Sequence, residues 1–332
     1  MKAIVYQKYG SPEEVFQLEE VVTPTPMDDD VLVKIHAASL NSIDWQISGG
    51  KSYFLRLLSG GLLKPRQKHK ILGDDIAGQV EVVGRNVTQF QPGDEVFGIC
   101  NYGAFAEYTC VTEDNLVQFF APKPSNLSFE EVAATPTAAI SALLALRDNG
   151  QIQSGEKVLI NGASGGVGTF AIQIAKNYGA EVTGVCSTSK MDMVRSIGAD
   201  HVINYEEEDF TKSDQCYDLI LDVAAYRSIF NYKRVLNPEG IYVCTGGSMG
   251  KFFQAAFLGP LISMRGNKKL GSGGMAQPTH EDFIFLKELL ETGKVVPVID
   301  RRYPLSEFVE AIRYYGEGHA RGKVVITVDQ ES

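Results

Sequence analysis

The chain has 332 residues, of which 44% are hydrophobic and 22% are charged, and its formal net charge is -10. A chain of this length exceeds the size at which a single hydrophobic core usually stops growing, so we expect two domains. Lys and Arg drive contacts with nucleic acids and anionic membranes, and the acidic balance therefore argues against both kinds of partner.

The first 122 residues contain short runs rich in Val and Ile, separated by Gly, Pro and Asp. Such runs, bounded by turn-forming residues, are typical of the strands of a compact β-rich domain. We therefore assign residues 1–122 to one β-rich domain. Its expected strands are KAIVY (2–6), VLVKIHAASL (31–40), IAGQVEVVG (76–84), DEVFGIC (94–100) and AEYTCV (106–111).

The N-terminal run also bears on location. KAIVYQKYG follows Met1 directly and indicates a strand, not a charged segment followed by a long apolar stretch. No later window approaches the roughly 18 consecutive apolar residues that a membrane span needs. The five cysteines are scattered and form no C-x-x-C pair, which favours reduced thiols. We expect a cytoplasmic protein without membrane contact.

After Pro124 the pattern changes to alternating helices and strands. Ser128, with Glu131 three residues on, is placed to cap a helix over the segment that follows. Short apolar strands separated by helices predict a parallel sheet covered on both faces, and hence a doubly wound Rossmann domain over residues 123–292. The expected strands are KVLIN (157–161), EVTGVC (181–186), HVINY (201–205), YDLILDV (217–223) and GIYVCTGG (240–247).

The C-terminal end of the chain contains one more strand-like run, GKVVITV (322–328). The set of apolar strands in the first domain looks incomplete without it. We therefore expect residues 293–332 to return to the first domain.

The strongest chemical signal is a glycine-rich turn between the strand KVLIN and a helix. Gly166, Gly168 and Ala171 fit G-x-G-x-x-A in that context. We assign the tight turn to Gly166, a close approach of backbone to pyrophosphate to Gly168, and helix-on-strand packing to Ala171. The free N–H groups of the helix would bind the anion, and the alternative is a turn without a ligand. The predicted contacts are Gly165, Gly166, Val167 and Gly168.

The end of the next strand decides between the two nicotinamide cofactors. An NAD site needs an Asp or Glu there for the ribose 2′-hydroxyl, whereas this chain has Ser187, Thr188, Ser189 and Lys190. Hydroxyls and an ammonium suit a 2′-phosphate, so we expect NADPH. The alternative is a polar cap on the following helix.

With that loop in place, the chain resembles zinc-free quinone oxidoreductases of the medium-chain dehydrogenase/reductase superfamily over almost its whole length. The resemblance implies a GroES-like β-barrel substrate domain and a Rossmann domain, with the active site between them, and commonly a homodimer. The matching stretches are NSIDWQ (41–46), LGDDIAGQVEVVG (72–84), FQPGDEVFG (90–98), GAFAEY (103–108), ATPTAAISAL (134–143), NGASGGVG (161–168), HVINY (201–205) and GKVVI (322–326).

The same resemblance implies roles for individual residues. Asn41 and Asp44 would lie beside the nicotinamide, and the alternative for this pair is a turn held by side-chain hydrogen bonds. A tyrosine that the family often has shortly afterwards is replaced by Trp45 and Gln46, and Tyr53 is close enough in sequence to take its place. The remaining implied cofactor contacts are Thr137 near the cofactor, Lys190 and Tyr205 at the 2′-phosphate, and Thr245, Gly246 and Gly247 at the nicotinamide ribose.

The segment 248–275 matches no motif of the family. Its apolar residues could line a substrate pocket, but large apolar side chains at helical spacing are more often packing. The residues concerned are Phe252, Phe253, Phe257 and Met264.

We expect no metal. Zinc-dependent relatives use Cys, His and Glu at two points of the substrate domain, and a catalytic zinc needs about three such ligands. Here Asn41 stands at the first point and Gly73-Asp74-Asp75 at the second. The five histidines, His36, His69, His201, His280 and His319, have no ligand-like spacing.

Without a Lewis acid, acceptors that delocalise the incoming charge are favoured. We therefore expect a reductase of quinones or α,β-unsaturated carbonyls, with Asn41 and Tyr53, or water, as candidate proton or hydrogen-bond donors. One alternative is an enoyl-thioester reductase, for which the basic residues Lys64, Arg66, Lys68 and Lys70 are the candidate carrier path; they could equally be a solvated loop. Another is an NADPH-binding structural or regulatory protein, since a fold does not fix a function.

Overall fold

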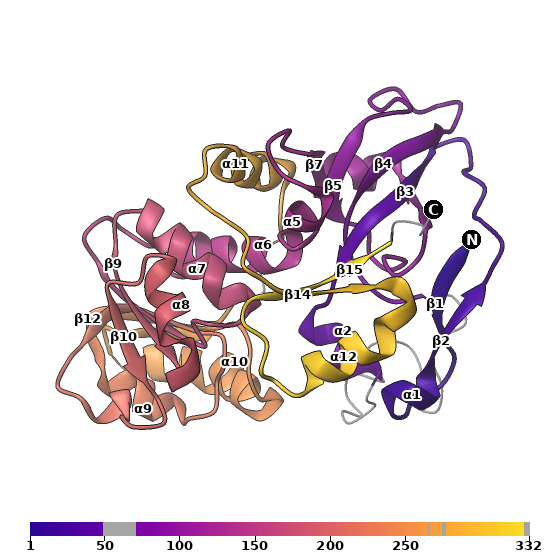
Figure 1. Cartoon of the computed structure of the whole chain (residues 1–332). Coiled ribbons are helices and arrows are strands. Elements are labelled where there is room, and N and C mark those ends of the chain that lie inside the picture. The colour runs from indigo at the N-terminus through magenta and orange to yellow at the C-terminus, as the bar shows by residue number, and fades with distance from the viewer. Residues whose placement is uncertain (49–70, 265, 274–276, 329–332) are drawn as a thin grey trace. The chain divides into compact units, whose positions relative to one another are not determined.

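The computed structural model describes residues 1–48, 71–264, 266–273 and 277–328 (Figure 1). They form two compact units. The first comprises Met1–Thr137, Thr279–Glu291 and Pro297–Ser332, and the second comprises Ala138–Pro278 and Thr292–Val296. No helix among the described residues is both long enough and apolar enough to cross a bilayer.

The first unit contains a seven-stranded, mostly antiparallel sheet and a separate hairpin. The strand order is β14-β15-β3-β4-β5-β7, and β6 also pairs with β3. The strands are β3 (Asp30–Ser39), β4 (Asp75–Val83), β5 (Glu95–Ile99), β6 (Tyr108–Thr112), β7 (Phe120–Pro122), β14 (Ile299–Pro304) and β15 (Lys323–Thr327), with β1 (Lys2–Tyr6) and β2 (Phe16–Glu20) in the hairpin.

The C-terminal strand lies inside this sheet, between the edge strand β14 and β3. β15 pairs antiparallel with β3, Val325 opposite Ser39, and it pairs parallel with β14 (Figure 1). Its consecutive apolar side chains Val324, Val325 and Ile326 are fully buried. Because successive side chains of a strand point to opposite faces of the sheet, both faces are covered here. The turn before it needs glycine: Gly322 has φ +88°, and a Cβ there would stand 2.2 Å from the carbonyl oxygen of Val298.

Helices and an aromatic cluster complete the first unit. The rings of Phe105 and Phe16 both pack against Phe308, at centroid distances of 4.6 Å and 4.9 Å. Ser128 and Glu131 form the predicted capping box at the start of α5. The helices are α1 (Pro12–Val15), α2 (Ser42–Ser48), α4 (Glu113–Phe119), α5 (Phe129–Ala133), α11 (His280–Glu291) and α12 (Phe308–Gly316), and α6 (Pro136–Leu144) begins here.

The second unit is a six-stranded sheet in which every pair is parallel. Its order, β10-β9-β8-β11-β12-β13, reverses direction between β8 and β11, as in a doubly wound sheet. The strands are β8 (Lys157–Asn161), β9 (Glu181–Cys186), β10 (His201–Asn204), β11 (Tyr217–Asp222), β12 (Leu236–Cys244) and β13 (Lys269–Ser272); the helices are α7 (Gly166–Asn177), α8 (Met191–Ser196), α9 (Ile229–Arg234) and α10 (Met249–Ser263).

The division into units differs from the sequence boundaries at 122/123 and 292/293. The first unit extends to Thr137 because α5 packs against β3 and β4, and it includes α11, which packs against β7 and α4. A change of residue pattern along the chain marks where strands give way to helices. It does not reveal which sheet each helix will cover.

Helix α10 contains the aromatic residues whose role the sequence left open. Phe252 packs against the core of the second unit, so the packing interpretation is confirmed for it. Phe257 is 68% exposed and Met264 is 83% exposed, so packing is wrong for these two side chains. The rings of Phe253 and Phe257 are parallel to within 22° at a centroid distance of 6.0 Å.

Candidate functional site

Asp75, the first residue of β4, is the centre of a buried polar cluster in the first unit. Its Oδ2 atom accepts hydrogen bonds from Ser39 Oγ at 3.1 Å, Asn41 Nδ2 at 3.0 Å and Lys323 Nζ at 3.2 Å. Its Oδ1 atom accepts from Thr137, from the amide at 3.0 Å and the hydroxyl at 2.5 Å. These donors use all of the roughly four lone-pair sites of a carboxylate.

Lys323 opens strand β15 and is 2% exposed. Its ammonium also donates to the carbonyl oxygen of Leu40 at 3.0 Å and to Asn41 Oδ1 at 2.6 Å. With Asp75 as the third acceptor, the three hydrogens of the ammonium are all used. The sequence analysis missed this residue. The available signal was a lysine at the start of a fully apolar strand, which requires a buried carboxylate as its partner.

The Asn41 side chain lies between these two charges and is 8% exposed. Lys323 can only donate, so the amide oxygen faces it and the amide nitrogen faces Asp75. Asp75 takes one of the two hydrogens on Nδ2. The ion pair therefore fixes both the position and the orientation of the Asn41 amide.

Asp44 is held in a turn with Asn41. The backbone N–H of Asn41 donates to Asp44 Oδ2 at 2.8 Å, and the backbone N–H of Asp44 donates to the Asn41 carbonyl at 3.2 Å. This is the turn that the alternative interpretation of the pair required. This turn explains the position of the Asp44 side chain. The predicted role of Asn41 and Asp44 beside a nicotinamide stays a prediction.

One ammonium in this cluster faces more than one carboxyl group. Burial raises the pKa of Asp44 well above its usual range, and the neighbouring charge of Asp74 raises it further. Burial also raises the pKa of Asp74 to about 6, against the lowering effect of the Tyr102 N–H, which donates to Asp74 Oδ1 at 2.8 Å. Both shifts make these carboxyl groups hold a proton to higher pH than an exposed aspartate does.

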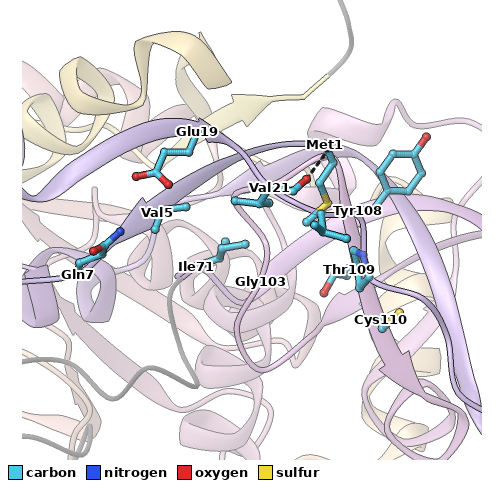
Figure 2. A pocket seen from close by; sticks show the side chains of 12 residues that line it. Met1, Val5, Gln7, Glu19, Val21, Ile71, Gly103, Tyr108, Thr109 and Cys110 are labelled. Atoms are coloured by element: carbon cyan, nitrogen blue, oxygen red, sulfur yellow. Dashed lines mark hydrogen bonds between the residues drawn. The ribbon is translucent and has the colours of Figure 1, made fainter.

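A pocket of about 470 Å³ in the same unit, whose lining Figure 2 shows, is lined by none of the residues of this cluster. Side chains of the β1–β2 hairpin and of β6 form much of its wall, and the N-terminal ammonium donates to the carbonyl oxygen of Val21 at its rim, at 2.8 Å. None of the predicted site residues that the structure describes lines it. Its labelled lining includes Val5, Gln7, Glu19, Ile71, Tyr108, Thr109 and Cys110.

In the second unit the glycine-rich turn joins β8 to α7 as predicted, but the tight turn assigned to Gly166 lies at another glycine. The tight turn is made by Gly162, with φ +84°, and not by Gly166, which is the first residue of α7. A Cβ on Gly168 would stand 2.2 Å from the carbonyl oxygen of Gly162, so this glycine lets the helix pack on the loop. Ala171 is fully buried in the helix, as expected for close packing.

The start of α7 fits an anion. Its N-cap, Gly165, has no side chain to bond the first-turn N–H groups, and no acidic residue lies in the first turn. Free N–H groups and the helix dipole together favour a phosphate at such a terminus. Across the sheet, after β12, the Thr245 hydroxyl oxygen is buried and has no hydrogen-bond partner among the described residues. Gly247 follows with φ +94°.

The ends of β9 and β10 bring a carboxylate into the region predicted for the 2′-phosphate. Thr188 donates to Glu206 Oε2 from its amide at 3.0 Å and from its hydroxyl at 2.7 Å. These bonds hold the pKa of the exposed Glu206 carboxyl below its usual range. Tyr205 beside it is 48% exposed. The sequence analysis placed Tyr205 in this region but missed Glu206, the next residue, because its contact with Thr188 joins the ends of two different strands.

Two family models match the chain: an alcohol dehydrogenase GroES-like domain over residues 27–123 and a zinc-binding dehydrogenase domain over residues 197–326. The mitochondrial NAD(P)H oxidoreductase RTN4IP1 of Mus musculus is 33% identical over 99% of this chain and 89% of its own. The 2-methylene-furan-3-one reductase of Solanum lycopersicum is 34% identical over 98% of this chain and 79% of its own. The solved quinone oxidoreductase of Coxiella burnetii superposes with a TM-score of 0.85 and 30% identity over 99% of both chains.

The chain belongs to the quinone oxidoreductase-like proteins of the medium-chain dehydrogenase/reductase superfamily. The predicted fold class is confirmed, a GroES-like domain and a Rossmann-like parallel sheet. Membership makes the protein an oxidoreductase that uses a nicotinamide cofactor and a small-molecule substrate.

Several predicted residues stay untested in this family member. Tyr53 and the basic residues between Lys64 and Lys70 lie outside the described residues. Within the described part of the chain, no three His, Cys, Asp or Glu side chains form a group that could hold a metal ion. The absence of a metal stays a prediction, as do the cofactor contacts of Thr137, Gly165 to Gly168, and Thr245 to Gly247.

Replacing Lys323 by Met tests the buried ion pair. Removal of one partner leaves Asp75 charged and uncompensated, so we expect the free energy of unfolding to fall by about 3 to 5 kcal/mol in urea denaturation. Lys212→Met is the control: that lysine pairs with Asp209 at 3.5 Å with 77% of its side chain exposed, and its loss should cost less than about 1 kcal/mol. Adding Asp75→Asn to Lys323→Met should recover part of the loss. Strictly additive losses would contradict the pairing.

Replacing Asp74 by Asn tests the raised pKa. Asp74 has a pKa of about 6 in the folded chain and about 3.9 when unfolded, so the folded state holds this proton more tightly. The stability that the group contributes is present below about pH 4 and is lost as pH rises through 6. An asparagine at this position does not titrate, so the Asp74→Asn variant does not lose stability in this pH range through residue 74. Its unfolding free energy relative to the original chain should therefore rise between pH 4 and pH 7, by up to about 3 kcal/mol. A pH-independent difference would argue against the assignment.

Proposed function

We propose that this protein is an NADPH-dependent, zinc-independent reductase that transfers hydride to a quinone or to the β-carbon of an α,β-unsaturated carbonyl. The observation that carries the proposal is the full occupancy of Asp75. Its oxygens accept from Lys323, Asn41, Ser39 and Thr137, so none is left to bind a metal at this second zinc-ligand point. A fixed ammonium stands there instead.

The missing Lewis acid restricts the substrate class. A simple ketone depends on a metal to polarise its carbonyl, which is worth several kcal/mol in the transition state. A quinone or enone delocalises the incoming charge into a hydroquinone anion or an enolate and needs less help. A 2-methylene-furan-3-one, the compound in the name of the tomato relative, is itself a conjugated ketone.

Bound NADPH would supply the hydride. The first turn of α7, with Gly165, Gly166, Val167 and Gly168, would bind the pyrophosphate through backbone N–H groups. The unpartnered Thr245 hydroxyl, with Gly246 and Gly247, would meet the nicotinamide ribose. Ser187, Thr188, Lys190 and Tyr205 would surround the 2′-phosphate.

In the first unit, Asn41 would donate the second hydrogen of its amide to the oxyanion that develops on the acceptor. The amide is held by two fixed charges, so it would need little reorientation during the reaction. Asp44 and Thr137 would act as positioning residues for this turn and for Asp75. Tyr53 stays a candidate donor.

The enoyl-thioester alternative, the homodimer and the location have less support than the reaction itself. The enoyl-thioester alternative depended on residues 64–70, which the structure does not describe, and no other observation favours it. A homodimer and a cytoplasmic location stay predictions from the sequence.

A panel of acceptors tests the substrate class. Loss of NADPH absorbance should be fast with a quinone and a short enal, and slow with a saturated ketone, because the ketone cannot delocalise charge. An enoyl thioester completes the panel. Prior dialysis against EDTA should leave the rates unchanged. One zinc per chain by elemental analysis, or activity confined to the ketone, would overturn the proposal.

Replacing Lys190 by Ala tests the cofactor. The phosphate loses a charge-assisted hydrogen bond, so the KM for NADPH should rise roughly tenfold or more, while the KM for NADH stays nearly constant. The exposed Lys212→Ala serves as a control for the removal of a positive charge. Equal losses with both cofactors would mean that Lys190 does not contact the 2′-phosphate.

A further inference from the structure

The ends of β9 and β10 lie side by side because the two strands are parallel neighbours, with Cys186 opposite Asn204. Thr188 follows the first strand and Glu206 follows the second, and both Thr188 donors are bonded to Glu206 Oε2. We propose that Glu206 is a cofactor-specificity residue that lowers the preference of this enzyme for NADPH over NADH. This inference rests on the proposed function, which places the adenosine ribose at this sheet edge.

The contact is held by a buried neighbour. Asn204 is 5% exposed; its Nδ2 donates to Thr188 Oγ1 at 2.7 Å, and its Oδ1 accepts from the Glu206 amide at 3.1 Å. Because Thr188 Oγ1 accepts from Asn204, its own single hydrogen is directed to the Glu206 carboxylate. The three residues form a closed hydrogen-bonded ring, which positions the otherwise exposed carboxylate.

A 2′-phosphate and this carboxylate compete for the same donors. Phosphate oxygens at neutral pH are acceptors, so a phosphate bound here would need the Thr188 amide and hydroxyl that Glu206 now occupies. It would also carry up to two negative charges next to a third. A ribose 2′-hydroxyl has a hydrogen to donate, and the Oε1 atom of Glu206 is a suitable acceptor for it. Glu206 therefore opposes the effect of Lys190 on the choice of cofactor.

Charges of both signs act on this sheet edge. The Cys186 thiol, the last residue of β9, has its pKa raised to about 11, mainly by burial. Lys190 and Arg195 lower that pKa and Glu206 raises it, so all three charges are felt at one strand end. A phosphate bound at this strand end would meet the negative charge of Glu206 as well as the positive charge of Lys190.

The test is a binding measurement on the full chain with Glu206→Gln. The substitution keeps the side-chain length and removes the charge. By fluorescence titration at low ionic strength, NADPH should bind about five- to tenfold more tightly than to the original chain, while NADH is unchanged or binds more weakly. Glu207→Gln is the matched control, since Glu207 is the adjacent exposed carboxylate, and it should leave the ratio of the two dissociation constants unchanged.

Each outcome decides for or against Glu206. Equal changes for both cofactors, no change in the ratio, or the same shift in Glu207→Gln would overturn the inference. A gain for NADPH that shrinks as salt is added would support it, because salt screens exposed charges. Binding does not depend on turnover. If Glu206→Gln shifts the ratio of the NADPH and NADH dissociation constants but the protein reduces no acceptor, the proposed reaction is overturned and the role of Glu206 stands. If the protein reduces the predicted acceptors but the ratio is unchanged, the proposed reaction stands and the role of Glu206 is overturned.

Discussion

The contact between Lys323 and Asp75 is the constraint on which the first unit depends. Taking two charges out of water is costly, and a pair this deeply buried is tolerated only when hydrogen bonds satisfy every remaining donor and acceptor. Ser39 and Asn41, at the end of β3, and Thr137, far along the chain, supply those bonds. The pair therefore fixes how β3 ends, how β4 and β15 begin, and how the Asn41 amide is turned. At this point the oxygens of Asp75 are already engaged by protein donors, which is the basis of the proposed zinc independence.

The predicted binding features of the second unit depend on backbone geometry, and those of the first unit on a side-chain cluster. The second unit's proposed contacts to an anion would come from backbone N–H groups, whose direction is fixed by the turn at Gly162 and by the packing of Gly168 on the loop. Backbone geometry of this kind follows from a short local motif, whereas the cluster around Asp75 follows from the tertiary fold. The contact on which the proposed cofactor selection rests again follows from the tertiary fold, since Glu206 reaches Thr188 from the neighbouring strand.

This difference explains what the sequence could predict. The parallel sheet, the strand–turn–helix at residues 157–177 and the cap at Ser128 are local patterns, and they were predicted correctly. The glycine motif was found, but the turn was assigned to Gly166 because the motif does not reveal which backbone has a positive φ. Lys323 and Glu206 were missed because their partners are distant in the chain or on another strand. The sequence boundaries left α5 and α11 out of the first unit for a similar reason, because residue composition does not indicate which sheet a helix packs against.

The distance along the chain between the members of the Asp75 cluster has a consequence for biosynthesis. Lys323 is 248 residues from Asp75 and 282 residues from Asn41. A ribosome adds residues in order, and the carboxylate therefore emerges long before its ammonium partner exists. Until β15 has been made, the sheet cannot cover Asp75 without burying an uncompensated charge. The ammonium that completes this cluster is therefore synthesised only after every residue of the second unit.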